Sequence, residues 1–260
     1  MPRLAANIGM LFADRPPLER VGAAAAAGFS AIEFQVPYAT AASDMKSEIG
    51  RHQLTVLGIN TGLGREGESG LAAVPGREQD FAAQLRQALD YAAAIGGSAI
   101  HCMAGVVPPE QRPVAEKTFV ANLKKGAPLA VEKNITLLIE PINSRDRPNY
   151  FLTRAEHAAA VIDQVGEPNV KMQFDFYHQQ IAGGDVLTRF EKHLPWIGHI
   201  QIAAVPSRAE PDDGELNYPA ILAAIDRLGY KGWVAGEYKP RGRTEDGLGW
   251  ARPYGVTPRS

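Results

Sequence analysis

Thr136-Leu-Leu-Ile-Glu140 is a short apolar run that ends in a carboxylate, and the same arrangement returns three times further along the chain. Val170-Lys-Met-Gln-Phe precedes Asp175, Trp196-Ile-Gly-His-Ile precedes Gln201, and Trp233-Val-Ala-Gly precedes Glu237. The number of residues between successive polar positions is close to that of one strand plus one helix. If the runs are parallel strands of one barrel, all four oxygen-bearing side chains converge at its carboxyl-terminal mouth, where barrel enzymes carry out their chemistry.

Short β-like runs alternate with longer stretches of helical period along the whole chain, which predicts parallel pairing through crossover helices. Eight strands are expected, over Leu4–Asn7, Ala31–Phe34, Thr55–Asn60, Ala99–Met103, Thr136–Ile139, Val170–Phe174, Ile197–Ile200 and Trp233–Gly236. Such units in 260 residues fit a single (β/α)8 TIM barrel of the α/β class. An open doubly wound sheet is the rival, but it usually has fewer strands and a glycine-rich phosphate turn, which we do not find. We expect a catalytic barrel over residues 1–252 and a loose tail over residues 253–260.

The composition argues against several classes of protein. With 27 basic and 29 acidic residues the net charge is -2, which disfavours nucleic acid or a membrane surface as a partner. The beginning of the sequence shows no apolar secretory segment, and no stretch approaches the roughly 20 apolar residues that span a bilayer. A single cysteine, Cys102, excludes an internal disulfide and a thiolate zinc site. A soluble cytoplasmic enzyme is the simplest expectation, and homo-oligomer formation stays open.

Glu140, Asp175, Gln201 and Glu237 offer three carboxylates and one amide oxygen. Hard oxygen donors suit Mg²⁺, or alternatively Mn²⁺, whereas zinc and copper sites usually recruit His or Cys. Three buried carboxylates without a cation would repel one another and raise their own pKa values. The alternative interpretation is four unrelated strand-end residues that are solvated or paired with basic groups. The recurrence of the pattern at one end of the expected barrel favours the metal site.

Such a site can move a proton between adjacent carbons of a hydroxy-carbonyl compound. The metal would chelate the carbonyl and hydroxyl oxygens and stabilise an enediolate. One carboxylate would remove the carbon-bound proton, and a second would return a proton to the neighbouring carbon. Glu140 and Glu237 come from separated strands, so we assign them acid/base roles as well as metal contacts. Asp175 and Gln201 would be ligands only.

Four residues are candidates for binding the substrate of this reaction. His178 follows Asp175 closely and can hydrogen-bond a substrate oxygen or orient a ligand; the alternative is a surface histidine. His101 can reach the mouth or be a satisfied core histidine. Arg208 and Lys239 can pair with the carboxylate of a small acidic substrate, although exposed loop positions are the commoner fate of such residues. Glu33, at another strand end, either lines the pocket or fixes the barrel wall.

Three expected strand-to-helix connections are longer than packing requires: Thr61–Pro75, Gly105–Arg112 and Ala203–Asn217. Long loops at the mouth of a barrel often bind or cover the substrate. The glycine-rich Thr61–Pro75 loop is expected to be a mobile lid.

With these residues in hand, the chain resembles the hydroxypyruvate isomerase family among the xylose-isomerase-like barrels. The segments that carry the resemblance are Phe34–Tyr38, Pro75–Glu78, Ile139–Asn143, Asp175–His178, His199–Ala203, Gly214–Tyr218 and Gly236–Pro240. The resemblance implies aldose–ketose isomerisation of hydroxypyruvate and 2-hydroxy-3-oxopropanoate (tartronate semialdehyde). It also implies that Glu140 and Glu237 are the acid/base pair, at a site with Asp175 and Gln201.

Two features bear on the branch of this family. Related ketose 3-epimerases carry a histidine where this chain has Gln201, which favours the hydroxypyruvate branch and Mg²⁺. The segments Met103–Pro108 and Lys239–Thr244 look more like relatives that act on four-carbon 2-oxotetronate. A hydroxy-oxo acid of three or four carbons is therefore the expected small-molecule partner, and a 3-epimerase is an alternative.

Other classes of protein remain as alternatives. A nuclease of the same barrel superfamily would need several zinc-binding histidines and a basic surface, which six histidines and a negative net charge disfavour. A lyase or dehydratase begins with the same proton abstraction and would differ in its product. A sugar-acid binding protein could use the same pocket, but it has no need of two opposed glutamates.

Overall fold

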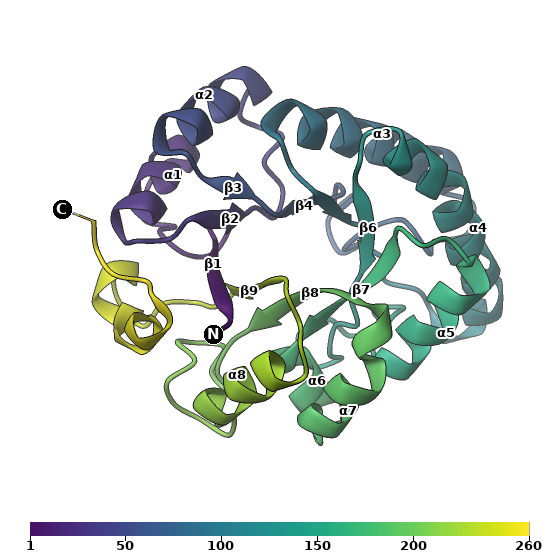
Figure 1. The fold of residues 1–260 in the computed structure, drawn as a ribbon. Coiled ribbons are helices and arrows are strands. Elements are labelled where there is room, and N and C mark those ends of the chain that lie inside the picture. Colours follow the sequence, from purple (N-terminus) through teal and green to yellow (C-terminus); the bar gives the residue numbers. More distant parts are fainter. Residues whose placement is uncertain (260) are drawn as a thin grey trace.

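The runs expected to be strands do form one parallel sheet, and one of the runs is divided in two. The computed structural model describes residues 1–259. Its strands are β1 Arg3–Asn7, β2 Ala31–Glu33, β3 Thr55–Val56, β4 Gly58–Asn60, β5 Ala99–His101, β6 Thr136–Ile139, β7 Val170–Asp175, β8 Ile197–Ile202 and β9 Trp233–Gly236. Figure 1 shows them in a ring with the helices outside. The single TIM-barrel fold is confirmed.

The division lies in the third expected strand, and the sheet closes there. The order of strands is β3-β2-β1-β9-β8-β7-β6-β5-β4, so both ends of the sheet belong to the run Thr55–Asn60. Leu57 separates the two halves, and its backbone N–H donates to Ile32 O at 2.8 Å. The first half pairs with β2 and the second with β5. One continuous run therefore joins both edges of the sheet, as a barrel of eight strand positions requires.

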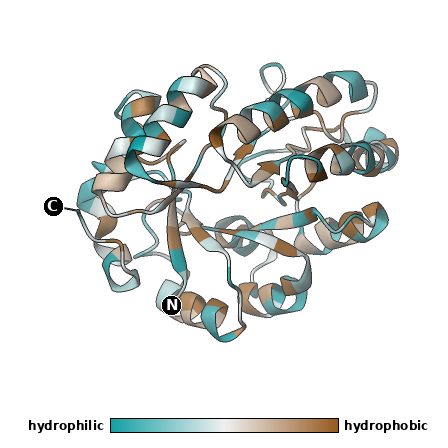
Figure 2. Cartoon of the chain, turned by 45° about the horizontal axis from the view of Figure 1, so that its top comes forward, coloured by the Kyte–Doolittle hydropathy of each residue, from teal (hydrophilic) through white to brown (hydrophobic). Residues whose placement is uncertain are grey.

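The helices cover the outside of the barrel, with hydrophobic and hydrophilic stripes (Figure 2). They are α1 Pro17–Ala26, α2 Ala42–His52, α3 Glu78–Ile95, α4 Arg112–Val131, α5 Ala155–Val165, α6 Phe176–Gly183, α7 Val186–His193 and α8 Tyr218–Arg227, with the 3-10 segments η1 Pro109–Gln111, η2 Leu194–Trp196 and η3 Thr244–Tyr254. In α3, the residues at helical spacing from Phe81 to Ala92 are buried. Within residues 1–259, none of the helices has the length and apolar character needed to cross a membrane.

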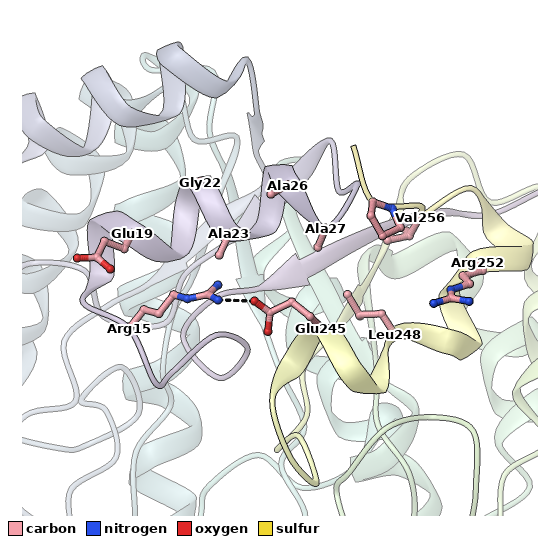
Figure 3. A pocket seen from close by; sticks show the side chains of 11 residues that line it. Arg15, Glu19, Gly22, Ala23, Ala26, Ala27, Glu245, Leu248, Arg252 and Val256 are labelled. Carbon is pink, nitrogen blue, oxygen red and sulfur yellow. Dashed lines mark hydrogen bonds and ion pairs between the residues drawn. The ribbon is translucent and has the colours of Figure 1, made fainter. Parts of the chain in front are cut away.

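Residues 256–259 pack near α1. Where the sequence predicts a loose tail from residue 253, η3 continues to Tyr254 and Val256 is buried. The backbone N–H of Arg259 donates to Ala26 O at 2.9 Å. Gly28, with φ +103°, allows this approach, because a Cβ there would overlap the Thr257 carbonyl. Between α1 and η3 a hollow of about 480 Å³ remains, shown in Figure 3.

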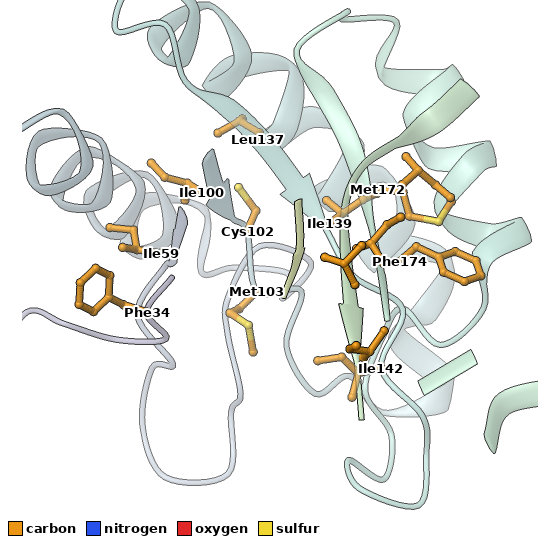
Figure 4. Close-up of a cluster of buried hydrophobic side chains, with 14 of the residues drawn as sticks. Phe34, Ile59, Ile100, Cys102, Met103, Leu137, Ile139, Ile142, Met172 and Phe174 are labelled. Atoms are coloured by element: carbon orange, nitrogen blue, oxygen red, sulfur yellow. The ribbon is translucent and has the colours of Figure 1, made fainter. Parts of the chain in front are cut away.

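Alternate strand residues face opposite sides of the barrel wall. In β6, Leu137 and Ile139 belong to the apolar cluster under the helices, part of which Figure 4 shows. Leu138 instead faces the interior, where it lines a small cavity with His101. The next inward position after Leu138 is Glu140, at the mouth. The inward side chains therefore form two layers: a lower layer, which includes Leu138 and His101, and a mouth layer, which includes Glu140.

Part of the Thr61–Pro75 loop at the barrel mouth is packed into the core. In the Thr61–Pro75 loop, expected to be a lid, Leu71, Ala72 and Ala73 are buried, and the N–H of Ala72 donates to Met103 O at 3.1 Å. The exposed part of this loop is Leu63–Gly67. The segment that can move without disrupting the core is therefore shorter than the sequence suggests.

Candidate active site

The four strand-end residues that the sequence singles out all lie at the carboxyl-terminal end of the barrel. Glu140 follows β6, Asp175 ends β7, Gln201 lies in β8 and Glu237 follows β9. All four are buried. Asp175 and Gln201 are direct register partners on neighbouring strands.

Three carboxylates and one histidine form a compact cluster. One ligand atom from each of Glu140, Asp175, His178 and Glu237 lies within 4.8 Å of the others. Oε1 of Glu140 and Oδ2 of Asp175 are buried and have no hydrogen-bond partner among residues 1–259. Buried carboxylate oxygens without donors are costly unless a cation binds them. The residues present therefore fit a divalent metal ion, and their oxygen-rich donor set is of the kind that Mg²⁺ and Mn²⁺ prefer.

The pKa values of the clustered carboxylates also fit a site for a divalent cation. Burial, and then repulsion from Glu237 and Asp175, raises the pKa of Glu140 well above its usual value. Burial, with repulsion from Glu237, raises the pKa of Asp175 to about 7. Burial also raises the pKa of Glu237, although the nearby Arg208 guanidinium opposes this. A divalent cation would reverse these shifts, because it stabilises the ionised carboxylates.

His178 presents an N–H toward the cluster. Its Nδ1 lies 2.6 Å from Nδ2 of Asn143, whose own Oδ1 accepts from Asp146 N at 2.9 Å. The Asn143 amide is thus turned with its N–H toward the ring, so Nδ1 accepts. Burial holds the pKa of His178 well below its usual value, so the neutral ring carries its proton on Nε2. That atom lies 3.6 Å from Oδ2 of Asp175 and suits donation to an oxygen better than metal ligation.

Gln201 is held below the carboxylate cluster. Its Nε2 donates to Oε1 of Glu33 at 2.6 Å, and its Oε1 accepts from Nε2 of Gln173 at 2.8 Å. A carbonyl oxygen has two lone pairs, so this contact leaves one for a further partner. Gln201 can therefore still be a metal ligand, because it lies next to Asp175 and its carbonyl oxygen can accept a further contact.

Arg208 reaches the cluster from the loop after β8. Its Nη2 lies 2.7 Å from Oε2 of Glu237, and its Nη1 lies 3.2 Å from Oδ2 of Asp146. Arg208 and His178 line a pocket of about 110 Å³ at the mouth, together with Glu140 and Glu237. This pocket is smaller than the hollow beside α1, but it holds the titratable groups. Arg208 thus lies where the sequence analysis expects a substrate-binding cation.

The other two candidates for substrate binding lie elsewhere. His101 lines the interior cavity of about 20 Å³ and not the mouth pocket. Its Nδ1 is 3.4 Å from Oε2 of Glu140, and burial lowers its pKa to about 3. Lys239 is exposed, and only its backbone N–H contacts the site region, by donating to Arg208 O at 2.8 Å. The structure therefore places Arg208 and His178 in the mouth pocket, His101 beneath it with one ring nitrogen near Glu140, and Lys239 outside it.

Some residues of the site have no assigned role from sequence. Asn7 ends β1 and Glu33 ends β2, and both are buried beside the cluster. The strand-end rule finds Glu33 and would have selected Asn7 too, had it been applied to the first strand. Asn143 and Asp146, which hold His178 and Arg208, lie in the loop after β6 and carry no pattern of their own.

Comparison with known proteins gives similarities over the whole barrel. Residues 21–254 match the family model described as xylose isomerase-like TIM barrel. The Cupriavidus necator protein named 2-oxo-tetronate isomerase is 47% identical over 98% of this chain and 99% of its own length. The Escherichia coli K12 protein named hydroxypyruvate isomerase is 39% identical over 98% of this chain and 100% of its own length. A crystal structure named as an AP endonuclease, family 2, from Brucella melitensis superposes with a TM-score of 0.96 at 42% identity, over 98% of this chain and 99% of that one.

Proposed function

This chain belongs to the xylose isomerase-like TIM barrel family and is an isomerase, and from that premise we propose that it interconverts hydroxypyruvate and 2-hydroxy-3-oxopropanoate. The reaction is a proton transfer between adjacent carbons through an enediolate, with a divalent metal ion as cofactor. The observation that carries the proposal is the buried cluster of Glu140, Asp175 and Glu237 at the barrel mouth.

Glu140, Asp175, Gln201 and Glu237 would hold the metal ion, with Mg²⁺ as the first choice and Mn²⁺ as the second. A cation bound there would polarise the substrate carbonyl and offset the negative charge that develops as the carbon-bound proton leaves. The partnerless oxygens of Glu140 and Asp175 support this assignment. A cluster of carboxylates favours binding of Mg²⁺ or Mn²⁺, which prefer oxygen ligands, over binding of zinc.

Glu140 and Glu237 are the proposed acid/base pair. They follow β6 and β9, which β7 and β8 separate in the sheet, so their carboxylates approach the pocket from different sides. One takes a proton from C3 of hydroxypyruvate, which leaves an enediolate, and a proton returned to C2 completes the aldehyde. The hydroxyl proton of C3 passes to the oxygen on C2, so the substrate and product have equal mass.

Two further side chains position the substrate in this proposal. Nε2–H of His178 donates to a substrate oxygen, because Asn143 occupies the other ring nitrogen. Arg208 binds the substrate carboxylate through its guanidinium, a geometry that suits two-point recognition of an anion. Lys239 is not needed for this contact, since it is exposed outside the pocket.

The four-carbon acid 2-oxotetronate is the second candidate substrate. The relative named 2-oxo-tetronate isomerase is 47% identical to this chain, against 39% for the one named hydroxypyruvate isomerase. Both substrates place a carboxylate beside C2 and require the same proton shift from C3 to C2. The same acid/base pair therefore serves either one, and the space beyond C3 decides between them.

The test is to incubate the protein with each acid in turn, with Mg²⁺, with Mn²⁺ and with EDTA, and to follow products by proton NMR. We expect metal-dependent formation of an isomer of equal mass, faster from one of the two acids. Loss of water would indicate a dehydratase. A 3-epimerase would isomerise neither acid but would invert C3 of a ketose supplied separately. A protein that binds metal but converts neither acid would exclude the isomerase assignment in favour of these alternatives or of a binding protein.

A further inference from the structure

Arg147 is an exposed cation at the rim of the mouth pocket that the proposed chemistry does not use. It lines the pocket of about 110 Å³ together with Arg208, Asp146 and both proposed acid/base glutamates. Within residues 1–259, no carboxylate lies within ion-pair distance of its guanidinium, whose one side-chain hydrogen bond runs from Nη1 to Asp146 O at 3.3 Å. Most of the N–H groups of Arg147 are therefore available to a ligand.

The other arginine of the pocket is already paired with carboxylates. Nη2 of Arg208 lies 2.7 Å from Oε2 of Glu237, and its Nη1 lies 3.2 Å from Oδ2 of Asp146. A substrate carboxylate that approaches Arg208 therefore meets two negative groups beside one positive group. Repulsion from Glu237 and Asp146 offsets much of the attraction between Arg208 and an anion. A further positive charge at this rim would strengthen the binding of an acid, and Arg147, next in sequence to Asp146, supplies one.

The backbone around Arg147 is held in place by hydrogen bonds. Its own N–H donates to Asn143 O at 3.1 Å, and its carbonyl accepts from Tyr150 N at 3.2 Å. Tyr150 is fully buried, and its hydroxyl accepts from Ala104 N at 2.9 Å. Arg145, two residues earlier on the same loop, is also exposed but does not line the pocket. The loop after β6 therefore places one arginine at the pocket and leaves another outside it.

We propose that Arg147 is a specificity-determining residue of this pocket: its unpaired positive charge selects a substrate that carries a carboxylate over a neutral ketose. The inference rests on the proposed function, because it takes the substrate to be a hydroxy-oxo acid. Arg208 contacts the bound carboxylate from the side of Glu237, and Arg147 contacts it from the rim. Because Arg147 is exposed and lies outside the carboxylate cluster, it acts on substrate affinity and not on proton transfer.

The experiment is a ligand-observed NMR titration of the full-length protein with D-glycerate in the presence of Mg²⁺. Glycerate keeps the carboxylate and the C3 hydroxyl of hydroxypyruvate but has no carbonyl, so it is not isomerised. We expect Arg147→Ala to weaken glycerate binding by about 5-fold, the upper value for an exposed ion pair. Arg147→Glu reverses the charge, so its loss should be about the square of that, ~25-fold. Arg147→Lys keeps the charge and should bind glycerate nearly as the wild type does.

Arg145→Ala and Arg145→Glu are the matched controls, because they make the same changes of charge on the same loop outside the pocket. We expect both to bind glycerate within about 2-fold of the wild type, since solvent and salt screen a more distant charge. The losses in the Arg147 variants should shrink as NaCl rises from about 0.02 to 0.3 M. None of these variants should bind dihydroxyacetone, the neutral counterpart of hydroxypyruvate, more weakly than the wild type.

Three results would overturn the inference. They are wild-type glycerate affinity in Arg147→Glu, equal losses on changing Arg145 and Arg147, and a wild-type protein that does not bind glycerate. None of these readouts involves turnover. A protein whose glycerate affinity depends on Arg147 as expected but which isomerises neither acid would contradict the proposed function and leave the role of Arg147 intact.

Discussion

Nη2 of Arg208 lies 2.7 Å from Oε2 of Glu237, so the cation proposed to bind substrate already contacts one of the two proposed acid/base groups. Its Nη1 lies 3.2 Å from Oδ2 of Asp146, and its guanidinium stands over the Tyr177 ring at 5.1 Å. These partners come from three different segments of the chain. Arg208 is therefore fixed at the rim of the pocket, where an arriving carboxylate must pass or bind.

Replacing Arg208 by alanine should lower kcat/KM by about 10–100-fold, the range for losing a hydrogen bond to a charged group. Glu237 also loses the cation that opposes the rise in its pKa, so the acidic limb of the pH–rate profile should move to higher pH. The matched control is Lys239→Ala, which removes an exposed cation two residues after Glu237. Steady-state kinetics over a pH series would check both variants. Equal losses in the two would contradict the specific role of Arg208.

Glu140→Gln and Glu237→Gln should each reduce kcat by about 10²–10⁴-fold, the usual contribution of one acid or base group. Glu140→Gln should not lower the unfolding temperature of the metal-free protein, because it removes one member of a repelling cluster. Glu237→Gln also breaks the ion pair with Arg208, so its unfolding temperature should lie below that of Glu140→Gln. Rates at saturating metal and substrate, with thermal unfolding in EDTA, would measure both effects. The exposed Glu132→Gln change serves as a control. Substantial activity in either cluster variant would remove that glutamate from the acid/base pair.

The His178 ring should be neutral, with its proton on Nε2. The reason is the 2.6 Å contact between its Nδ1 and Nδ2 of Asn143. Nitrogen-15 NMR of labelled protein distinguishes the two tautomers and the charged ring directly. Asn143→Leu removes this donor and should let the other tautomer appear, with a lower kcat. A signal from protonated Nδ1 in the wild type would contradict the proposed donation from Nε2.

Metal-free protein should lose stability as the pH rises. The pKa of Asp175 is raised from 3.8 to about 7, so the folded chain holds this proton more tightly than the unfolded chain does. Stability from this group is therefore full below about pH 4 and is lost as the pH approaches the folded value. Unfolding temperatures in EDTA at about pH 5 and about pH 8 should fall more for the wild type than for Asp175→Asn. Mg²⁺ should restore stability at the higher pH, where the carboxylates are ionised. Parallel behaviour of the two proteins in EDTA would count against the raised pKa.

The barrel can be predicted from the sequence because strands and helices each have their own spacing of apolar residues. The division at Leu57 has no such sequence signal. The run from Thr55 to Asn60 is continuous in sequence, and it is divided only because its two halves pair with different strands. The strand-end rule finds Glu140, Asp175 and Glu237 because parallel strands end at the same face of a barrel.

The register of β5 decides where His101 lies. His101 pairs with Leu138, which lies one inward position below Glu140, so its ring enters the interior layer. Lys239 lies outside the pocket, because the chain has left the barrel wall by that residue. The pairing of Glu33 with Gln201 depends on side chains far apart in sequence, and only the closed barrel brings them together.

Glu140 and Glu237 are proposed to move a proton between C3 and C2 at a metal site, and the fate of that proton tests these roles. Proton NMR of the product formed in D₂O, with Mg²⁺ present, reports whether solvent deuterium has entered at C2. We expect deuterium at C2, complete or partial, since a carboxylic acid exchanges its proton with water before returning it. Conversion with full retention of the substrate's hydrogen at C2 under all conditions would indicate a hydride shift and contradict the acid/base roles of Glu140 and Glu237.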